Sequence, residues 1–494
     1  MAQATTLGEL KKQGYQPKSI KQELRDNLIS RIENRQQVFE GIYGFDDTVI
    51  PDMERAILSK HNILLLGLRG QAKTRLARLL VDLLDEYVPI IEGSELNDDP
   101  MAPLSSFGKK LVAQLHDETP VKWIHRSERY VEKLATPDVS VADLIGDVDP
   151  IKAATLKLPY SDERVIHFGL IPRSHRCIFV INEIPDLQAR IQVSLFNILQ
   201  EGDIQIRGFK TRLPLDIQFV FTANPEDYTN RGSIITPLKD RIESQILTHY
   251  PESIETAKTI TSQEATIARR QSQKVVVPDV IRNILERISF AARKSEFIDE
   301  KSGVSARLSI TALENLYSTA ERRTLINGEP KTIARIADFW GVIPSITGKI
   351  ELVYEGEVEG QYNVALQLVS QAIRQEFLEV FPHPDKFKKG KERDPYGAIR
   401  AFFGDSNVVV LPNDLDDYSF NSLLDSVPGM DRLLEAHKIP KQEFHVYKEI
   451  VLHSLADLDV LTKELTQGKI GFSDPLGKML NDLDEDERDC GHRA

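Results

Sequence analysis

The chain has 494 residues, of which 41% are hydrophobic, enough for two or three domains with substantial cores. Its formal net charge of −13 argues against a general affinity for nucleic acid. Cys177 and Cys490 are too few for a disulfide framework and favour a reducing compartment; Cys177, in an apolar run, is predicted to be a core residue. The sequence shows neither an apolar run of about 18 residues nor a signal-peptide core, which predicts a cytoplasmic protein without membrane spans.

The first half of the chain reads as a helical arm followed by an α/β domain. Residues 1–40 are charged and helix-prone, with a thin apolar stripe of Leu24, Leu28 and Ile32, and are predicted to lie on the main domain. From 41 to 252, apolar runs alternate with helical patterns, which is typical of a parallel sheet covered by helices. The predicted strands are Ile63–Leu66, Val88–Ile91, Cys177–Ile181, Ile217–Ala223 and Gln245–Tyr250. An insert at roughly 92–176 and a β-hairpin at 204–213 complete this region.

The second half is mainly helical. Over 253–350 the pattern predicts helices, notably Val280–Ser295 and Ser309–Leu325, and residues 351–494 form a further region. The lysine-rich segment 383–397 is predicted to be a linker or exposed loop. The acidic segment 481–489 is predicted to be disordered.

The most informative segment joins the first predicted strand to a helix. It resembles the phosphate-binding pattern G-x-x-x-x-G-K-[ST], in which loop amides and a helix N-terminus bind polyphosphate. The residues expected to contact the nucleotide are Gly67, Leu68, Arg69, Gly70, Gln71, Ala72, Lys73 and Thr74. Lys73 is expected at the β- and γ-phosphates and the Thr74 hydroxyl at Mg²⁺. A strand–turn–helix with a chance Lys-Thr is the alternative, but the leucines at helical spacing after the loop favour the nucleotide site.

One loop position departs from the pattern, because Ala72 stands where a second glycine is expected. Alanine is the smallest replacement for glycine. We therefore expect the phosphate cradle to form if the φ angle of Ala72 is negative.

Polar residues follow two further predicted strands. Asn182 and Glu183 stand where an ATPase commonly has Asp and Glu, the Asp holding the Mg²⁺ shell and the Glu polarising the attacking water. Asn182 is expected to reach Mg²⁺ through a bound water without supplying charge, so Asn182→Asp should maintain or raise hydrolysis. Asn224 is expected to read the γ-phosphate beside Glu183. An ordinary strand-end acid and a turn-forming Asn224-Pro225 are the alternative interpretations.

Two arginines are candidates for contacts with the γ-phosphate. Arg241 precedes the fifth predicted strand, at a domain edge from which it could reach a neighbouring subunit's nucleotide as a finger. Asp240-Arg241 as a surface ion pair is the alternative. Arg307 opens a predicted helix and could close onto bound phosphate.

Taken together in this order along the chain, these motifs resemble those of the AAA+ ATPases of the magnesium-chelatase I-subunit and MoxR clade, over about residues 37–350. The segments that carry the resemblance, besides the phosphate loop, are Gly41–Asp47, Asp143–Pro150, Phe168–Arg176, Leu195–Gly202 and Thr222–Tyr228. The resemblance implies a three-layer α/β/α P-loop domain, a helical lid at 253–350 and a mainly helical extension at 351–494. It places Tyr43 and Gly44 on the adenine side, and assigns Asn224 as sensor 1, Arg241 as arginine finger and Arg307 as sensor 2.

The same resemblance implies ATP and Mg²⁺ as cofactors, a hexameric ring and a partner with a von Willebrand factor A domain. The predicted function is a motor ATPase that remodels a partner protein. A metal-chelatase motor in tetrapyrrole biosynthesis is one alternative, and a nucleotide-gated scaffold with little turnover, motivated by Ala72 and Asn182, is another. An activator of the σ54 type is disfavoured because its Gly-Ala-Phe-Thr-Gly-Ala loop is absent from the sequence.

Overall fold

The computed structural model describes residues 3–475 except 161, 207–208, 210–211, 226–232, 388–393 and 467. The chain divides into two compact units, Met1–Tyr250 and Pro251–Ala494. The acidic segment 481–489 and part of the lysine-rich segment 383–397 lie outside the described residues.

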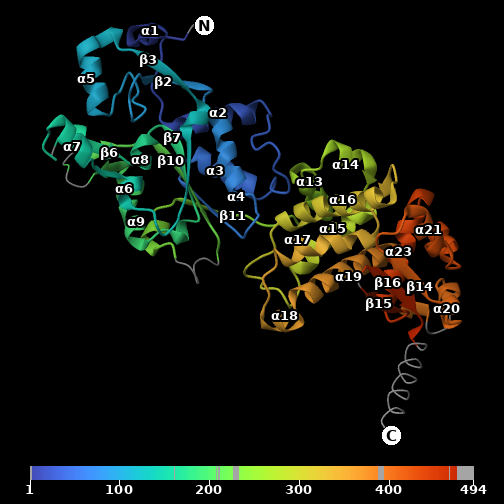
Figure 1. The fold of residues 1–494 in the computed structure, drawn as a ribbon. Helices are drawn as coiled ribbons and strands as arrows, with labels where there is room; N and C mark the ends of the chain where they lie inside the picture. Colours follow the sequence, from blue (N-terminus) through green and yellow to red (C-terminus); the bar gives the residue numbers. More distant parts are fainter. Residues whose placement is uncertain are drawn as a thin grey trace. The chain divides into compact units, whose positions relative to one another are not determined.

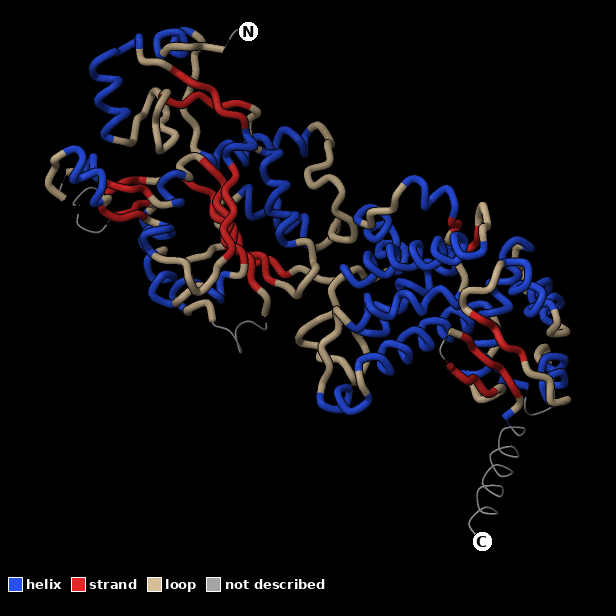
Figure 2. The backbone as a smooth tube through the Cα atoms, viewed as in Figure 1, coloured by secondary structure: helices blue, strands red, loops and turns tan. Residues whose placement is uncertain are grey.

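The N-terminal unit contains a parallel sheet with helices on both faces (Figures 1 and 2). Its helices are α1 (Leu7–Lys12), α2 (Ile20–Glu33), α3 (Val49–Leu58), α4 (Lys73–Leu79), α5 (Ser106–Leu115), α6 (Val141–Leu144), α7 (Pro150–Leu156), α8 (Leu170–Arg173), α9 (Ala189–Ser194), α10 (Phe196–Glu201) and α12 (Thr236–Lys239). Its strands are β1 (Ile63–Leu66), β2 (Tyr87–Ile91), β3 (Val121–His125), β4 (Tyr130–Leu134), β5 (Gly146–Val148), β6 (Ile166–Phe168), β7 (Cys177–Asn182), β8 (Asp203–Gln205), β9 (Arg212–Pro214), β10 (Ile217–Ala223) and β11 (Ser244–Leu247).

The central sheet has the order β11-β1-β10-β7-β4, and every pairing in it is parallel. Side chains of a strand alternate between the two faces. One face packs with α2, α3 and α4 in a core that includes Leu65, Val180 and Val220. The other face packs with α8, α9 and α10 in a core that includes Leu64, Phe179 and Phe221. The fold is therefore the predicted α/β class with three layers.

One predicted strand assignment was wrong. The apolar run Val88–Ile91 forms β2, which pairs antiparallel with β3 in a separate two-stranded sheet. Its predicted place in the central sheet is taken by β4, which lies within the segment predicted to be an insert. Apolar character indicated that residues 88–91 are buried but did not indicate which strand pairs with them.

Several smaller predictions are confirmed. Strands β8 and β9 form the expected antiparallel hairpin. Leu24 and Leu28 of α2 are buried in the core beneath the sheet, although Ile32 is 43% exposed. Cys177 is a buried residue of β7, and burial raises the pKa of its thiol to about 11.

The C-terminal unit is mainly helical. Its helices are α13 (Ile254–Glu264), α14 (Arg269–Lys274), α15 (Asp279–Ala292), α16 (Arg307–Asn327), α17 (Ile343–Thr347), α18 (Tyr354–Glu359), α19 (Gln361–Val380), α20 (Gly397–Gly404), α21 (Asp417–Asp425), α22 (Met430–Ala436) and α23 (Phe444–Asp457). Its strands are β12 (Val275–Val276) and β13 (Thr332–Ile333), paired in parallel, and the antiparallel β14 (Val409–Pro412), β15 (Thr462–Thr466) and β16 (Lys469–Ser473).

One hydrophobic core runs through this unit and joins α15 and α16 to α19 and α23. The assignment of 253–350 as a lid and 351–494 as an extension remains a prediction. Among the helices that the structure describes, none is long and apolar enough to cross a membrane.

Candidate nucleotide-binding site

The phosphate loop lies where β1 ends, at the carboxyl edge of the central sheet. Strand β1 runs between β10 and β11, and all four of its residues are buried. A Cβ atom on Gly67 would overlap the Thr248 hydroxyl and the Gln71 side-chain oxygen. Glycine is therefore required at this position for the loop to pass so close to the end of β11. The loop then turns into α4, whose first residue is Lys73.

Lys73 is directed back into the loop that precedes it. Its side chain is 8% exposed, and its ammonium donates hydrogen bonds to the carbonyl oxygens of Gly67 and, at 3.0 Å, Leu68. A cation held against the loop backbone at a helix N-terminus is the arrangement that binds polyphosphate in P-loop proteins. Thr74 follows on the first turn of α4 and is half-buried.

The backbone of Ala72 differs from the expectation. Its φ is +56° and its ψ is +15°, in the left-handed region, and not the negative φ on which the cradle was expected to depend. The loop nevertheless connects β1 to α4, with Gly70 at φ +74° also in the left-handed region. Ala72 therefore occupies a glycine conformation and carries backbone strain, because a Cβ atom crowds the carbonyl group there.

The end of β11 connects the loop to the predicted adenine-side segment. The Thr248 hydroxyl donates to Gln71 Oε1 at 2.8 Å, and the Tyr250 hydroxyl donates to the Arg69 carbonyl at 2.9 Å. His249 packs edge-on against Phe45, with ring centroids 5.0 Å apart. Tyr43, which is 41% exposed, and Gly44 immediately precede Phe45. Residues 248–250 thus contact both the phosphate loop and Phe45, the residue that follows Tyr43 and Gly44.

Strand β7 ends in the predicted metal and catalytic residues. Asn182 is 8% exposed, and its Oδ1 accepts a hydrogen bond from the Thr222 hydroxyl at 3.0 Å. The backbone N–H of Glu183 donates to that same hydroxyl oxygen at 3.1 Å. Glu183 itself has φ +55°, a left-handed conformation that non-glycine residues rarely adopt and that concentrates at functional sites.

Asn224 follows β10, between β1 and β7 in the sheet. Its side chain is 6% exposed, and its Oδ1 has no hydrogen-bond partner among the described residues. A buried polar atom without a partner is unfavourable and commonly marks the place of a water, ion or ligand. Asn224, Glu183 and Lys73 therefore follow three strands that are neighbours in the sheet, at one edge.

Sequence reasoning missed an acid at this edge. Glu132 lies on β4, and its Oε1 accepts a hydrogen bond from Asn182 Nδ2 at 2.6 Å. Its carboxylate also pairs with Arg78 of α4, at 3.0 Å from Nε, and this bond raises the pKa of the arginine. The available signal was weak: Tyr130 and Val131 favour a strand, but the adjacent charged residues Glu132 and Lys133 interrupt the apolar pattern.

The two arginines predicted to contact the γ-phosphate, Arg241 and Arg307, lie in different units of the chain. Arg241 is tied to its own chain: Nε donates to Gln200 Oε1 at 3.1 Å, Nη1 donates to the Pro237 carbonyl at 2.7 Å, and the guanidinium lies over the Phe196 ring. Asp240 is not its partner in any of these contacts. Arg307 is an exposed residue at the start of α16 in the C-terminal unit, so its relation to the phosphate loop remains a prediction.

The donor set at the sheet edge fits ATP with Mg²⁺. Among the described residues, no three His, Cys, Asp or Glu side chains gather as a metal cluster. Mg²⁺ in nucleotide sites is commonly held by substrate phosphates, waters and one or two protein oxygens. The Thr74 hydroxyl could supply such an oxygen, the Asn182 amide could accept a hydrogen bond from a metal-bound water, and Lys73 could supply the charge for the phosphates.

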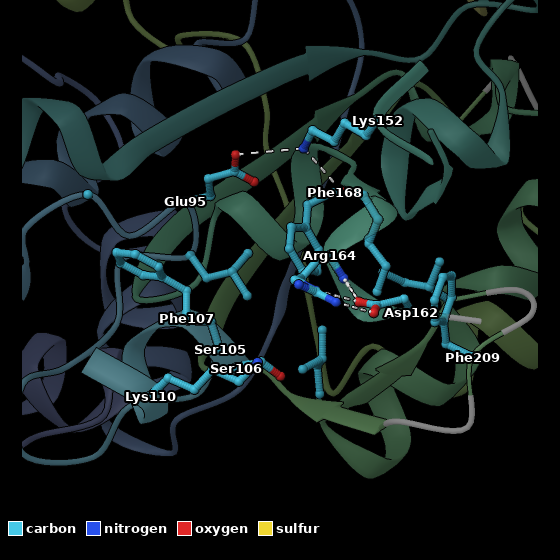
Figure 3. Close-up of a pocket in the computed structure, with 15 residues that line it drawn as sticks. Glu95, Ser105, Ser106, Phe107, Lys110, Lys152, Asp162, Arg164, Phe168 and Phe209 are labelled. Carbon is cyan, nitrogen blue, oxygen red and sulfur yellow. Dashed lines mark hydrogen bonds and ion pairs between the residues drawn. The ribbon is translucent and has the colours of Figure 1, made fainter. Parts of the chain in front are cut away.

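A separate cavity of about 500 Å³ lies in the same unit, and none of the predicted nucleotide-binding residues lines it (Figure 3). Two pairs of its charged side chains oppose each other: Arg164 pairs with Asp162 at 2.7 Å, and Lys152 lies 4.0 Å from Glu95. Such paired charges are a poorer cradle for a triphosphate than the loop amides and Lys73. The phosphate loop, not this cavity, is the better candidate site.

Comparison with known proteins agrees with this geometry. The family model described as the Sigma-54 interaction domain, an AAA+ domain, matches residues 159–246, which include β7, Glu183, β10, Asn224 and residues 244–246 of β11. The matched segment covers less than a fifth of the chain and resembles an AAA+ ATPase domain. No curated protein matches this chain.

Solved structures resemble this chain only distantly. One is a complex of BchI and BchD of magnesium chelatase, with 18% identity, 65% of this chain and 98% of that chain covered, and a TM-score of 0.34. Another is NtrX from Brucella abortus in complex with ATP, with 12% identity, 71% of this chain and 66% of that chain covered, and a TM-score of 0.39.

Proposed function

We propose that this AAA+ chain is a Mg²⁺-dependent ATP hydrolase that couples nucleotide turnover to remodelling of a partner protein, in the manner of the MoxR and chelatase I-subunit ATPases. The observation that carries the hydrolase proposal is the common edge of β1, β10 and β7. At that edge lie a buried lysine in a phosphate loop, an asparagine whose buried oxygen has no partner within the described part of the chain, and a strand-end glutamate. These are the groups that bind phosphate, read it and polarise water.

In this proposal each residue has a defined part. Gly67–Thr74 hold the triphosphate, with Lys73 at the β- and γ-phosphates and the Thr74 hydroxyl at Mg²⁺. Asn182 contributes to the Mg²⁺ shell through a bound water, and Glu183 polarises the attacking water. Asn224 orients that water against the γ-phosphate. Bound Mg²⁺ neutralises the charge that develops on the phosphoryl oxygens.

The proposal also includes an assembly. A homo-oligomeric ring, hexameric by the family resemblance, would place Arg241 of one subunit near the nucleotide of the next. Arg307 would close onto the phosphate from the lid. The proposed partner carries a von Willebrand factor A domain, and cytoplasmic location is part of the same proposal.

The experiment that tests nucleotide binding is calorimetry with ATP on the wild-type chain and on Lys73→Ala. Loss of a charge-assisted contact of about 1.5–3 kcal/mol should weaken ATP binding at least tenfold. Lys60→Ala is a suitable control, because Lys60 lies two residues after the end of helix α3 and does not belong to the loop. Equal ATP affinity in wild type and Lys73→Ala would rule out the phosphate-loop assignment.

A second candidate, a nucleotide-gated scaffold with little turnover, is favoured by the strained Ala72 and by Asn182 in place of an acid. Phosphate release separates the two proposals: ATP binding without Mg²⁺-dependent phosphate release would favour the scaffold. A metal-chelatase motor rests on the sequence resemblance alone. Coupling of ATP hydrolysis to metal insertion into a porphyrin, assayed with the partner subunits, would distinguish it from the protein-remodelling role.

A further inference from the structure

Glu132, which has no assigned role, lies beside Asn182, the position at which an ATPase commonly has an aspartate. In the proposed site, position 182 is an amide and brings no charge to the metal. Glu132 is in register with Val180 on the neighbouring strand, and Leu134 is in register with Asn182. Because side chains on a strand alternate, the side chains of Glu132, Val180 and Asn182 lie on one face of the sheet. Val180 packs there with α4, the helix that follows the phosphate loop.

The Glu132–Asn182 contact is part of a continuous hydrogen-bond chain across the sheet. Asn182 Nδ2 donates to Glu132 at 2.6 Å, Asn182 Oδ1 accepts from Thr222, and Thr222 accepts from the backbone N–H of Glu183. The Glu132 side chain is 23% exposed, and it also accepts from the Tyr130 hydroxyl at 3.1 Å. Burial raises the pKa of Tyr130, so this hydroxyl stays a donor.

The Glu132 carboxylate beside Asn182 Nδ2 makes Asn182 Oδ1 a stronger hydrogen-bond acceptor. The charge-assisted hydrogen bond polarises the amide and increases the negative charge on its oxygen. It also fixes which end of the amide is the acceptor, since Nδ2 must face Glu132. An amide oxygen has two lone pairs, and Thr222 uses one of them. The other is available to a water bound to Mg²⁺.

We propose that Glu132 is a positioning residue that supplies, through Asn182, the negative charge that holds Mg²⁺ at the nucleotide. This inference rests on the proposed nucleotide site. The Glu132–Asn182 pair would then take the place of a single strand-end aspartate, with the charge one hydrogen bond further from the metal. The competing explanation is purely structural: Glu132 fastens β4 to α4 through Arg78.

The pair also corrects the expectation for Asn182→Asp. With Glu132 2.6 Å from the amide nitrogen, an aspartate at 182 would bring two carboxylates into contact. Two like charges at such a distance cannot both remain ionised without a large cost. Asn182→Asp alone should therefore weaken the Mg²⁺ effect, whereas the same substitution combined with Glu132→Gln should restore it.

The test is calorimetry with ADP as the probe, in EDTA and in Mg²⁺, so that the readout is binding and not turnover. Glu132→Gln should leave the Kd for ADP in EDTA unchanged and reduce the Mg²⁺-dependent gain in affinity about tenfold or more, as loss of an outer-shell partner does. The double variant Glu132→Gln with Asn182→Asp should recover most of that gain. Glu128→Gln removes the same charge from an exposed residue nearby that accepts a hydrogen bond from the His125 backbone N–H, and it should leave the Mg²⁺-dependent gain unchanged.

Arg78→Gln separates the positioning role from the structural one. The Arg78 side chain is 63% exposed, so its replacement should not unfold the protein. If Glu132 acts through Asn182, Arg78→Gln keeps the Mg²⁺-dependent gain; if Glu132 only fastens α4, Arg78→Gln reduces the gain as Glu132→Gln does.

Two results would overturn the inference while leaving the nucleotide site intact: an undiminished Mg²⁺ gain in Glu132→Gln, or a larger benefit of Asn182→Asp in the wild-type background than beside Glu132→Gln. Failure of the wild-type chain to bind ADP would overturn the proposed function as well.

Discussion

The left-handed backbone of Ala72 leads to a quantitative prediction for Ala72→Gly. A residue with a Cβ atom at φ +56° carries a cost of roughly 1–2 kcal/mol relative to glycine. Glycine removes that cost but adds about 0.4–1 kcal/mol of conformational entropy to the unfolded chain. We therefore expect Ala72→Gly to raise the free energy of unfolding of the N-terminal unit by about 0.5–1 kcal/mol.

The assay is thermal unfolding, following the transition that ADP shifts, since that transition belongs to the nucleotide-binding unit. For a unit of this size, the expected gain corresponds to a rise in Tm of about 1–4 °C. Ala77→Gly is the matched control in the same helix. Ala77 is fully buried and helical, so glycine there should lower stability by about 1 kcal/mol or more.

Lys60→Gly is a second control, because Lys60 also has a positive φ, +59°, but lies outside the loop. It should raise the Tm without changing the affinity for ADP. Ala72→Gly should hold or raise that affinity, because the loop amides keep their geometry with less strain. A lower Tm for Ala72→Gly, or a lower affinity for ADP, would refute the strain argument.

Three further predictions concern catalysis and pH. Glu183→Gln should bind ATP as wild type does and lose phosphate release, because only the water-polarising carboxylate is removed; retained turnover would exclude Glu183 from that role. Arg241→Ala should reduce kcat by about 10³-fold or more with little change in affinity, and mixing it with Glu183→Gln chains should partly restore activity; assembled mixed rings without recovered hydrolysis would count against a finger in trans. Glu449 is fully buried, and burial raises its pKa from 4.5 to about 7. Between these two pH values the folded C-terminal unit binds more protons than the unfolded chain. Its free energy of unfolding should therefore fall as the pH rises through that window, by about 1.4 kcal/mol per pH unit at most. Urea unfolding measured at several pH values should give a smaller change of unfolding free energy with pH for Glu449→Gln than for wild type.

The placement of the candidate residues at one edge of the sheet could be predicted from the sequence because they follow buried parallel strands. Runs such as Cys177–Ile181 are apolar on both faces, and the polar residues directly after them must lie at the carboxyl edge. Strand β4 could not be predicted in this way. It is the edge strand of the sheet, half-exposed, and its charged residues Glu132 and Lys133 break the apolar pattern. The acid nearest to Asn182 was therefore hidden in a segment assigned to an insert.

The conformation of Ala72 could not be predicted for a different reason. Residue type sets the cost of a left-handed φ but does not set φ itself, which the surrounding contacts decide. Here the loop is held by Thr248 at Gln71 and by Tyr250 at Arg69, both from the end of β11. These contacts are about 180 residues away in the sequence from the loop they fix, and a local pattern does not reveal them.

The two departures from the usual ATPase motif act on different parts of the site, and this affects the choice between motor and scaffold. In the proposed site, strain at Ala72 would affect how readily the phosphate cradle forms, whereas the amide at Asn182 would affect Mg²⁺ binding. Neither departure replaces Glu183, the proposed water-polarising residue. Glu183 is instead held in its left-handed turn by a hydrogen bond to Thr222, whose hydroxyl is oriented by Asn182, which Glu132 orients in turn. Strained residues persist where surrounding contacts over-determine them. A scaffold that only binds nucleotide has no need to maintain such strain at a strand-end glutamate, and this favours the motor.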